Sequence, residues 1–127
     1  MILHNDAHVV LREAAIAAQT AYDNAMQTLT REERTRLVGL GGDGTPTHYL
    51  DEVVEAPVLD VFERFGVNVL SEEIGWIDRG SSMTLVVDPL DGTANAAAGV
   101  PLACFSAAIA LDGELVEGLA VWLDGGR

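Results

Sequence analysis

The sequence predicts a mixed α/β fold, an α+β sandwich in which two long helices pack on a mixed or antiparallel sheet. Apolar residues recur at the three- and four-residue spacing of an amphipathic helix over residues 3–29 and 45–65. Two short apolar runs, 67–70 and 83–87, are typical of buried strands. With 127 residues and 49% hydrophobic content, the chain can bury one core and leaves little room for a second domain.

The first predicted helix is followed by a short capped turn and a glycine-rich loop. Its apolar positions run from Leu3 to Leu29 along one face. Thr30 and Glu33 then have the spacing of a capping box, which predicts a brief helical segment. The run 39–44 contains four glycines and is expected to form a mobile loop.

The second predicted helix has a start signal, a stop signal and an internal proline. Thr45 is a suitable N-cap, and Pro46 suits the first helical position because no amide donor is needed there. Gly66 provides the stop. Pro57 lies within the periodic face, where a proline removes a backbone donor and clashes with the preceding turn at a cost of about 3 kcal/mol. We therefore predict a kink or a break at Pro57.

The second half of the sequence predicts a hairpin in addition to the two buried strands. Residues 104–111 and 115–122 flank Asp112 and Gly113, a dipeptide that favours positive backbone φ in a two-residue turn. We expect these two segments to pair as antiparallel strands. The two earlier strands both run directly into acidic residues, so each delivers carboxylates at its end.

The charge of the chain is strongly acidic. There are 20 Asp and Glu residues against seven Arg and no Lys, which gives a formal net charge of −13. Such a surface repels nucleic acid and anionic lipid, so neither is an expected partner. A phosphorylated substrate would be repelled as well, unless divalent cations on the carboxylates cancel the charge. Acidity also serves solubility, so composition alone does not decide between these interpretations.

Other features bear on the compartment. Cys104 is the only cysteine, which excludes an internal disulfide and fits a reducing cytoplasm. The start of the chain carries charged residues such as Asp6 where a signal peptide would need a continuous apolar stretch. The uncharged run 94–111 is interrupted by Asn95 and Pro101, so we expect it in the protein interior and not in a membrane. We expect a cytoplasmic protein.

Three groups of acidic residues carry the candidate chemistry. Glu72 and Glu73 follow the first strand, Asp88 and Asp91 follow the second, and Asp51 lies on the second helix. Asp91 comes three residues after Asp88 across a proline-constrained turn, so both carboxylates are expected to point to a common centre. Such oxygen ligands suit Mg²⁺. Taken singly, each acid is more typical of a turn, a solvated loop or the polar face of a helix.

A candidate phosphate site follows these acids. Thr93 is a natural N-cap for a short helix over 94–98. The backbone amides of Gly92 and Thr93 are then expected to face the carboxylate centre and to hold a phosphate. A cation site and an anion site would lie next to each other.

These residues resemble the signature of a known enzyme family. Residues 88–95 read Asp-Pro-Leu-Asp-Gly-Thr-Ala-Asn and are followed by Gly-Val-Pro at 99–101, which is similar to the motif of the inositol monophosphatase family. The upstream acidic pair strengthens the resemblance. The runs 42–47 and 66–75 resemble the branch with combined fructose-1,6-bisphosphatase and inositol monophosphatase activity. The resemblance implies the N-terminal half of the family's layered αβαβα sugar-phosphatase fold.

Carried over to this sequence, the family pattern implies a set of metal ligands. Asp88 would be shared between metals, Glu72 would bind the first metal, and Asp91 would bind the second. The backbone carbonyl of Leu90 would complete the first group of ligands. Glu73 is the alternative to Glu72, since one sequence does not exclude a shift of one residue.

The resemblance also implies a mechanism. Thr93 and Asp51 would orient and deprotonate a metal-activated water, and Glu72 would contribute to catalysis as a metal ligand. Asp43, on the glycine-rich loop, would help to bind a third metal. The implied reaction is hydrolysis of a small phosphorylated sugar or cyclitol, such as inositol 1-phosphate or fructose 1,6-bisphosphate, with two or three Mg²⁺ ions.

The length of the chain departs from the family pattern. Family members are about twice as long, and their second half supplies a further metal-binding aspartate and most contacts to the substrate ring. We therefore expect residues 1–127 to be the N-terminal metal-binding half of a phosphatase domain, either as a truncated piece or as one half of a split enzyme. A homo-oligomer or a pairing with a C-terminal half is the expected assembly.

Two other functions are to be weighed against this one. The Asp-Gly-Thr sequence after a buried strand also resembles phosphatases with an aspartyl nucleophile, but those place their two aspartates two residues apart, whereas Asp88 and Asp91 are three apart. A catalytically incomplete chain would instead serve as a metal-binding or phosphate-binding assembly module. Phosphate release measured with and without an added second half separates the enzyme from the module.

Overall fold

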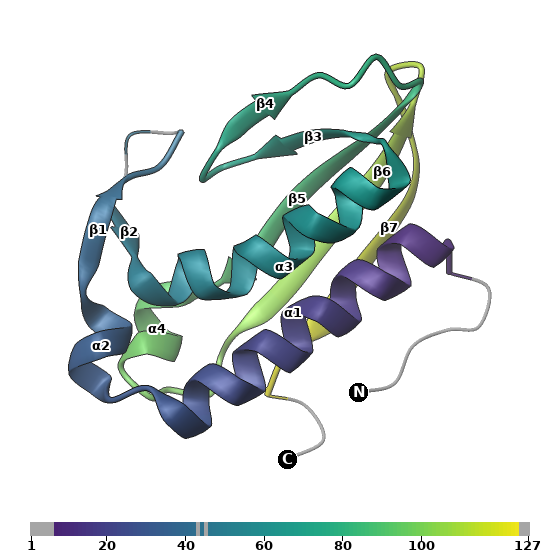
Figure 1. Ribbon diagram of the computed structural model, residues 1–127. Helices are drawn as coiled ribbons and strands as arrows, with labels where there is room; N and C mark the ends of the chain where they lie inside the picture. Colours follow the sequence, from purple (N-terminus) through teal and green to yellow (C-terminus); the bar gives the residue numbers. More distant parts are fainter. Residues whose placement is uncertain (1–6, 43, 45, 125–127) are drawn as a thin grey trace.

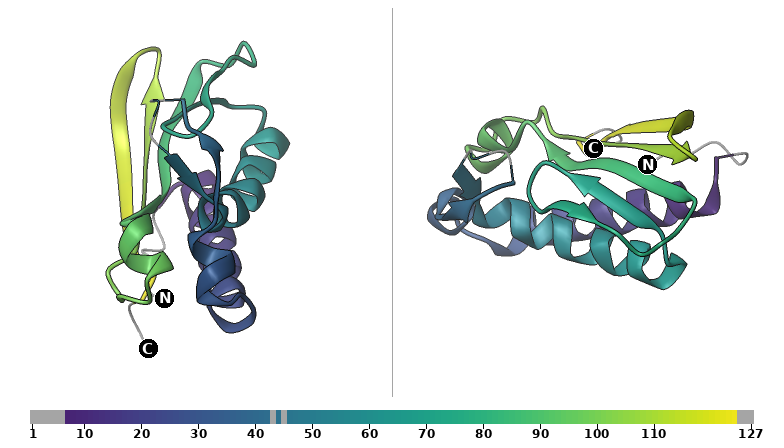
Figure 2. Two further views of the ribbon diagram at one scale, coloured as in Figure 1. Left: turned by 90° about the vertical axis from the view of Figure 1, so that its left-hand side faces the viewer. Right: turned by 90° about the horizontal axis from the view of Figure 1, so that it is seen from above.

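The computed structural model describes residues 7–42, 44 and 46–124 of the chain. The fold has two layers, because a pair of long helices, α1 (Val9–Thr28) and α3 (Tyr49–Phe65), covers one face of a five-stranded sheet (Figure 1). The helices run side by side in opposite directions, and Figure 2 shows both layers from two further sides. The predicted class, helices packed on a mixed sheet, is confirmed.

The sheet has the strand order β4-β3-β5-β6-β7. β3 pairs with β5 in parallel, and the other three pairings of this sheet are antiparallel. Because β3 and β5 run in the same direction, their C-terminal ends meet at one edge of the sheet, where acidic residues follow both strands. The strands span Asn68–Ser71 (β3), Gly75–Ile77 (β4), Met83–Asp91 (β5), Cys104–Leu111 (β6) and Glu114–Trp122 (β7).

The hairpin formed by β6 and β7 confirms the prediction from its turn residues. Asp112 and Gly113 have positive φ angles of 50° and 86°. Two successive positive φ angles give a hairpin turn whose twist matches that of the flanking strands. β7 begins at Glu114, one residue earlier than predicted.

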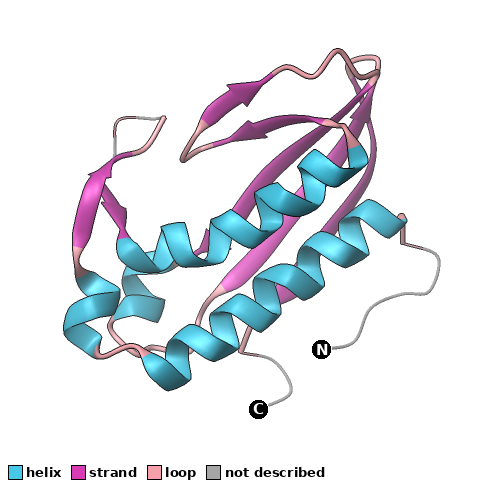
Figure 3. Ribbon diagram, viewed as in Figure 1, coloured by secondary structure: helices cyan, strands magenta, loops and turns pink. Residues whose placement is uncertain are grey.

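Figure 3 shows the two long helices lying over the sheet. The buried apolar side chains of both layers form one core cluster between them. Along β6, the side chains of Phe105 and Ile109 are buried against the helical layer, in line with the period of two along a strand. The opposite face of the sheet is open, and Trp76 and Trp122 are 54% and 59% exposed on it. The largest side chain buried on α1 is that of Tyr22, and on α3 that of Phe62.

The first helix begins later than predicted. The prediction placed its start at residue 3; residues 3–6 lie outside the described part of the chain, and α1 starts at Val9. His8 is its N-cap, since its Nδ1 accepts a hydrogen bond of 3.1 Å from the backbone amide of Val10. Apolar spacing identifies the buried face of a helix, but it does not identify the N-cap residue at which the helix begins.

A short helix and a two-stranded ribbon connect α1 to α3. The helix α2 (Arg31–Thr35) has the predicted capping box. The Thr30 hydroxyl oxygen accepts a hydrogen bond from the Glu33 amide, and the Glu33 carboxylate accepts one from the Thr30 amide. The ribbon pairs β1 (Leu37–Leu40) with β2 (Pro46–His48) in antiparallel fashion. A mobile loop was predicted from residue 39 onward; the structure instead extends a strand into it.

The second helix also begins later than predicted. Pro46 was expected at the first helical position but lies in β2, and the predicted N-cap, Thr45, lies outside the described residues. The N-cap is His48, whose backbone amide donates to Asp51 Oδ2 at 2.9 Å. The fixed φ of proline suits a strand edge as well as a first helical turn, so Pro46 alone did not define the start. Gly66 ends the helix in the left-handed region (φ 67°), as predicted.

The predicted break at Pro57 is absent, since α3 is continuous from Tyr49 to Phe65. A proline in a helix interior costs about 3 kcal/mol. Packing offsets this cost, because side chains on both sides of Pro57, among them Val54 and Val58, are completely buried.

The segment 94–111 was expected in the interior, and this holds only in part: Phe105 and Ile109 are buried, whereas Val100 and Leu102 are 42% and 55% exposed. The segment contains most of the helix α4 (Thr93–Ala97) and all of β6, and no helix in the described residues is long and apolar enough to cross a membrane.

Candidate functional site

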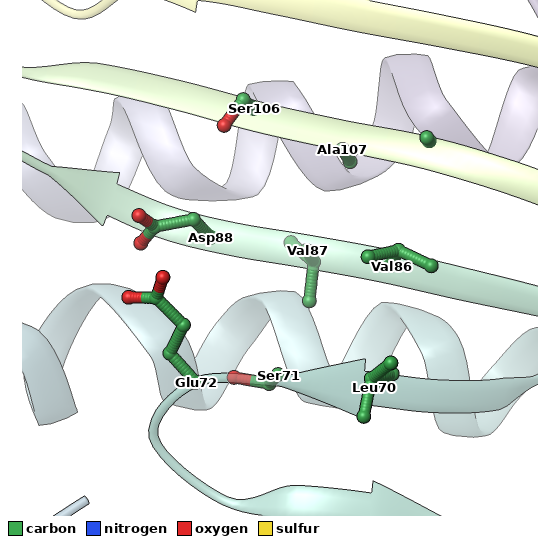
Figure 4. A pocket seen from close by; sticks show the side chains of 9 residues that line it. Leu70, Ser71, Glu72, Val86, Val87, Asp88, Ser106 and Ala107 are labelled. Carbon is green, nitrogen blue, oxygen red and sulfur yellow. The ribbon is translucent and has the colours of Figure 1, made fainter. Parts of the chain in front are cut away.

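The acidic residues that follow β3 and β5 meet at one edge of the sheet. Ser71 pairs with Val87 in the parallel register, so the next residues along the two strands, Glu72 and Asp88, are neighbours. Figure 4 shows their carboxylates turned towards each other. Both line a groove of about 480 Å³ on the open face of the sheet, together with small and apolar residues of β3, β5 and β6. The structure therefore brings together two of the predicted metal ligands.

The environment of Asp88 disfavours its ionised form. Burial, together with the negative charges of Glu72 and Asp91, raises the pKa of Asp88 to about 6, against the lowering effect of a hydrogen bond from the Leu90 backbone. The charge of Asp51 also contributes to the increase. A bound cation would relieve this repulsion, because it favours the ionised form of every carboxylate around it.

The segment from Asp88 to Asp91 is a bulged strand and not the turn that we predicted. Asp88 pairs with Ser106 and Asp91 pairs with Cys104, so three steps along β5 match two steps along β6. The extra residue changes the direction of the side chains on the bulged strand. Pro89, which cannot donate to a sheet ladder, was the sequence signal for this bulge.

Thr93 and Asp51 are brought together although they are distant in sequence. Thr93 Oγ1 donates to Asp51 Oδ1 at 2.5 Å and approaches the Leu90 carbonyl oxygen at 2.9 Å. Asp51 is only 5% exposed, and its other oxygen accepts the His48 amide described above. The side chains predicted to act on a water are therefore joined to each other and lie beside the carbonyl predicted as a metal ligand.

The predicted N-cap of the short helix is one residue too late. Gly92 is the N-cap of α4, with φ at 82°, and Thr93 is the first residue of the helix. A Cβ atom at residue 92 would lie 2.6 Å from the carbonyl oxygen of Leu102, so glycine is required both by the backbone angle and by the contact. The Thr93 hydroxyl does not cap the helix and instead donates to Asp51. Phosphate binding by the amides of Gly92 and Thr93 stays a prediction.

Glu72 and Glu73 have different surroundings. Glu73 Oε2 accepts from Thr47 Oγ1 at 2.6 Å, and its backbone carbonyl accepts from the Gly42 amide at 2.7 Å. Glu73 thus connects the β3–β4 turn to the β1–β2 ribbon, whereas Glu72 faces Asp88. Asp43, predicted to help bind a third metal, lies outside the described residues.

Glu55 belongs to this region, and the sequence analysis did not identify it. It lies one helical turn after Asp51 on α3, is buried, and accepts a hydrogen bond of 3.0 Å from Ser71 Oγ. Burial, together with the charges of nearby carboxylates, raises the pKa of Glu55 to about 7, against the lowering effect of the bond from Ser71. An acid inside the apolar stripe of a helix was the available signal.

The donor atoms at this edge fit a hard divalent cation. Carboxylate and carbonyl oxygens are the ligands that Mg²⁺ and similar ions prefer, and Glu72, Asp88 and the Leu90 carbonyl are of this kind. In the described part of the chain, no three His, Cys, Asp or Glu side chains are grouped closely enough to hold a metal ion. The edge therefore provides suitable donors without a closed ligand cluster.

Comparison with known proteins identifies the family. The model of the inositol monophosphatase family matches residues 8–121, so the chain belongs to this family. A fructose-1,6-bisphosphatase/inositol-1-monophosphatase from Thermococcus kodakarensis is 49% identical over 72 residues, which are 57% of this chain and 28% of that protein. A fructose-1,6-bisphosphatase from Pyrococcus furiosus is 36% identical over 77% of this chain and 39% of that protein.

Solved structures agree with this assignment. The MJ0109 gene product, an inositol monophosphatase-fructose 1,6 bisphosphatase, superposes with a TM-score of 0.78 and 28% identity over 88% of this chain and 44% of that chain. The predicted family and branch are confirmed by these matches of sequence and fold. The chain spans less than half the length of these relatives.

Proposed function

We propose that this chain is the N-terminal metal-binding half of a Mg²⁺-dependent phosphatase that hydrolyses a small sugar or cyclitol phosphate. The observation that carries the proposal is the bonded pair Thr93 and Asp51 beside the bulged, acidic end of β5. Family membership supports the reaction class. The names of the relatives support fructose 1,6-bisphosphate and inositol 1-phosphate as substrates.

In the proposed site, Glu72, Asp88, Asp91 and the Leu90 carbonyl hold the cations, with Glu73 and Asp43 as further candidates. Two or three Mg²⁺ ions, when bound, would supply charge neutralisation and polarise the water and the phosphate. The raised pKa of Asp88 supports this role, because the same repulsion that disfavours its charge favours a cation.

Thr93 and Asp51 are the proposed groups that act on water. With its own proton directed to Asp51, the Thr93 hydroxyl has a lone pair free to accept a hydrogen bond from a water in the groove. Proton transfer from that water to Thr93, and from Thr93 to Asp51, would generate the nucleophile. The bond from the His48 amide holds the Asp51 carboxylate in place during this step.

The proposed assembly and compartment follow from the same features. Since the relatives extend well beyond the matched region, we propose that a second half, in the same or another polypeptide, supplies the contacts to the sugar or cyclitol. A homo-oligomer is the other proposed assembly. The acidic charge argues against a nucleic-acid or membrane partner, and the single cysteine fits the cytoplasm.

Phosphate release from fructose 1,6-bisphosphate and inositol 1-phosphate tests the proposal, measured with Mg²⁺ and with or without an added second half. We expect Asp88→Asn to abolish both Mn²⁺ binding and turnover. Asp60→Asn, the same change at an exposed position of α3, is the control and should change neither. Near-normal turnover of Asp88→Asn would refute the assignment, and a trapped phosphoaspartate would favour the aspartyl-nucleophile class. Metal binding without turnover in any combination would favour the assembly module.

A further inference from the structure

A buried hydrogen-bond chain lies directly behind the acidic edge. Glu55, on α3, is 7% exposed, and Ser71, the last residue of β3, is 4% exposed. Ser71 Oγ donates to Glu55 Oε2 at 3.0 Å and accepts from the backbone amide of Glu73 at 3.3 Å. The chain of bonds therefore runs from helix to strand end to the β3–β4 turn.

These two hydrogen bonds fix the orientation of the Ser71 hydroxyl. A hydroxyl has one proton to donate in a hydrogen bond, and that of Ser71 is directed to the Glu55 carboxylate. A lone pair of Ser71 Oγ is therefore directed to the Glu73 amide. Ser71 points inwards, and successive side chains at the end of a strand alternate between faces. Glu72 is consequently directed to the open face, where Figure 4 shows it opposite Asp88.

We propose that Glu55 is a positioning residue that acts through Ser71 to hold the Glu72 carboxylate opposite Asp88, and thereby sets the affinity of the site for divalent cations. This inference rests on the proposed function. Burying an acid is expensive even when a hydroxyl such as that of Ser71 bonds it, and an apolar residue at this helix position would pack at lower cost. The β3–β4 turn has a second attachment, since Thr47 Oγ1 donates to the side-chain carboxylate of Glu73, whereas Ser71 accepts from its backbone amide. Glu55 and Thr47 thus hold the turn from two different elements.

The test measures Mn²⁺ affinity of the full chain by electron paramagnetic resonance. We expect Glu55→Ala and Ser71→Ala each to weaken binding by about tenfold or more, the usual effect of removing an outer partner of a metal ligand. The double variant should be no worse than either single variant, because both remove the same interaction. Glu55→Gln keeps an acceptor for Ser71 and should restore most of the affinity. Val58→Ala, a truncation in the buried face of α3, should lower the melting temperature and leave the affinity unchanged.

Amide hydrogen exchange of the metal-free protein gives a second measurement. Glu55→Ala should accelerate exchange at the Glu73 amide, and Val58→Ala should not do so selectively. If Asp88→Asn loses Mn²⁺ binding while Glu55→Ala and Ser71→Ala retain it, the positioning role is refuted and the proposed function stands. If Asp88→Asn binds Mn²⁺ normally, or the unaltered chain binds none, both proposals are refuted.

Discussion

Removal of the Glu55 charge should make the metal-free protein more stable at alkaline pH. The pKa of Glu55 is raised from 4.5 to about 7, first by burial and then by the charges of Glu73, Asp51 and Asp88, against the lowering effect of the Ser71 bond. A carboxyl whose pKa is higher in the folded state binds its proton more tightly there than in the unfolded state. Its contribution to stability is complete below about pH 4.5 and is lost as the pH rises through about 7.

The size of the effect follows from the pKa difference. At about 1.4 kcal/mol per pKa unit, the rise from 4.5 to about 7 corresponds to about 3 kcal/mol of unfolding free energy. Glu55→Gln keeps the shape and an acceptor oxygen but cannot ionise. Relative to the unaltered chain, this variant should therefore gain about 3 kcal/mol between about pH 4.5 and pH 8.5.

Urea denaturation with a chelator present, at the two ends of this pH range, measures the effect. The comparison of Glu55→Gln with the unaltered chain at each pH cancels the titration of groups that do not interact with Glu55. Equal pH dependence in the two proteins would show that Glu55 is not desolvated as the structure describes, and would refute the reasoning.

Two further substitutions test single contacts of the site. Thr93→Ala should leave the Mn²⁺ dissociation constant unchanged and reduce turnover by about 10²-fold or more, since it removes the hydroxyl next to Asp51 and no metal ligand; a parallel loss of metal binding in an affinity titration would contradict the assigned role. Gly92→Ala should lower the unfolding free energy by about 2–4 kcal/mol in urea denaturation, through the positive φ and the contact with the Leu102 carbonyl. Gly113→Ala, with a similar φ of 86° and open space around the added atom, is the matched control and should cost only about 1 kcal/mol.

Local signals in the sequence predicted most of the elements. The capping box of Thr30 and Glu33, the stop at Gly66 and the turn at Asp112 and Gly113 each depend on residues within one turn of the chain, and each is found. The hydrophobic spacing gave the faces of α1 and α3. These features are predictable because the interactions that form them are short in sequence.

The errors arose where tertiary contacts decide. The break at Pro57 is absent because burial along α3 outweighs one lost hydrogen bond. Thr93 is not a cap because its hydroxyl bonds Asp51, which is 42 residues away. Glu55 was missed for the same reason, since only the fold places Ser71 next to it. The site is thus predictable in its residue types and less so in the contacts that hold them.

The two titrating carboxyls at this edge have different surroundings, and this difference suits a division of roles. Asp88, with a pKa of about 6, ionises first as the pH rises and faces the groove, where its charge can meet a cation. Glu55, with a pKa of about 7, keeps a larger neutral fraction behind the sheet, bonded to Ser71. Adding a cation in the groove would lower the pKa of the nearby carboxyls and so stabilise the protein most above about pH 6, where Asp88 is ionised. The repulsion at the edge, which weakens the metal-free fold, is therefore the same interaction that would favour the loaded one.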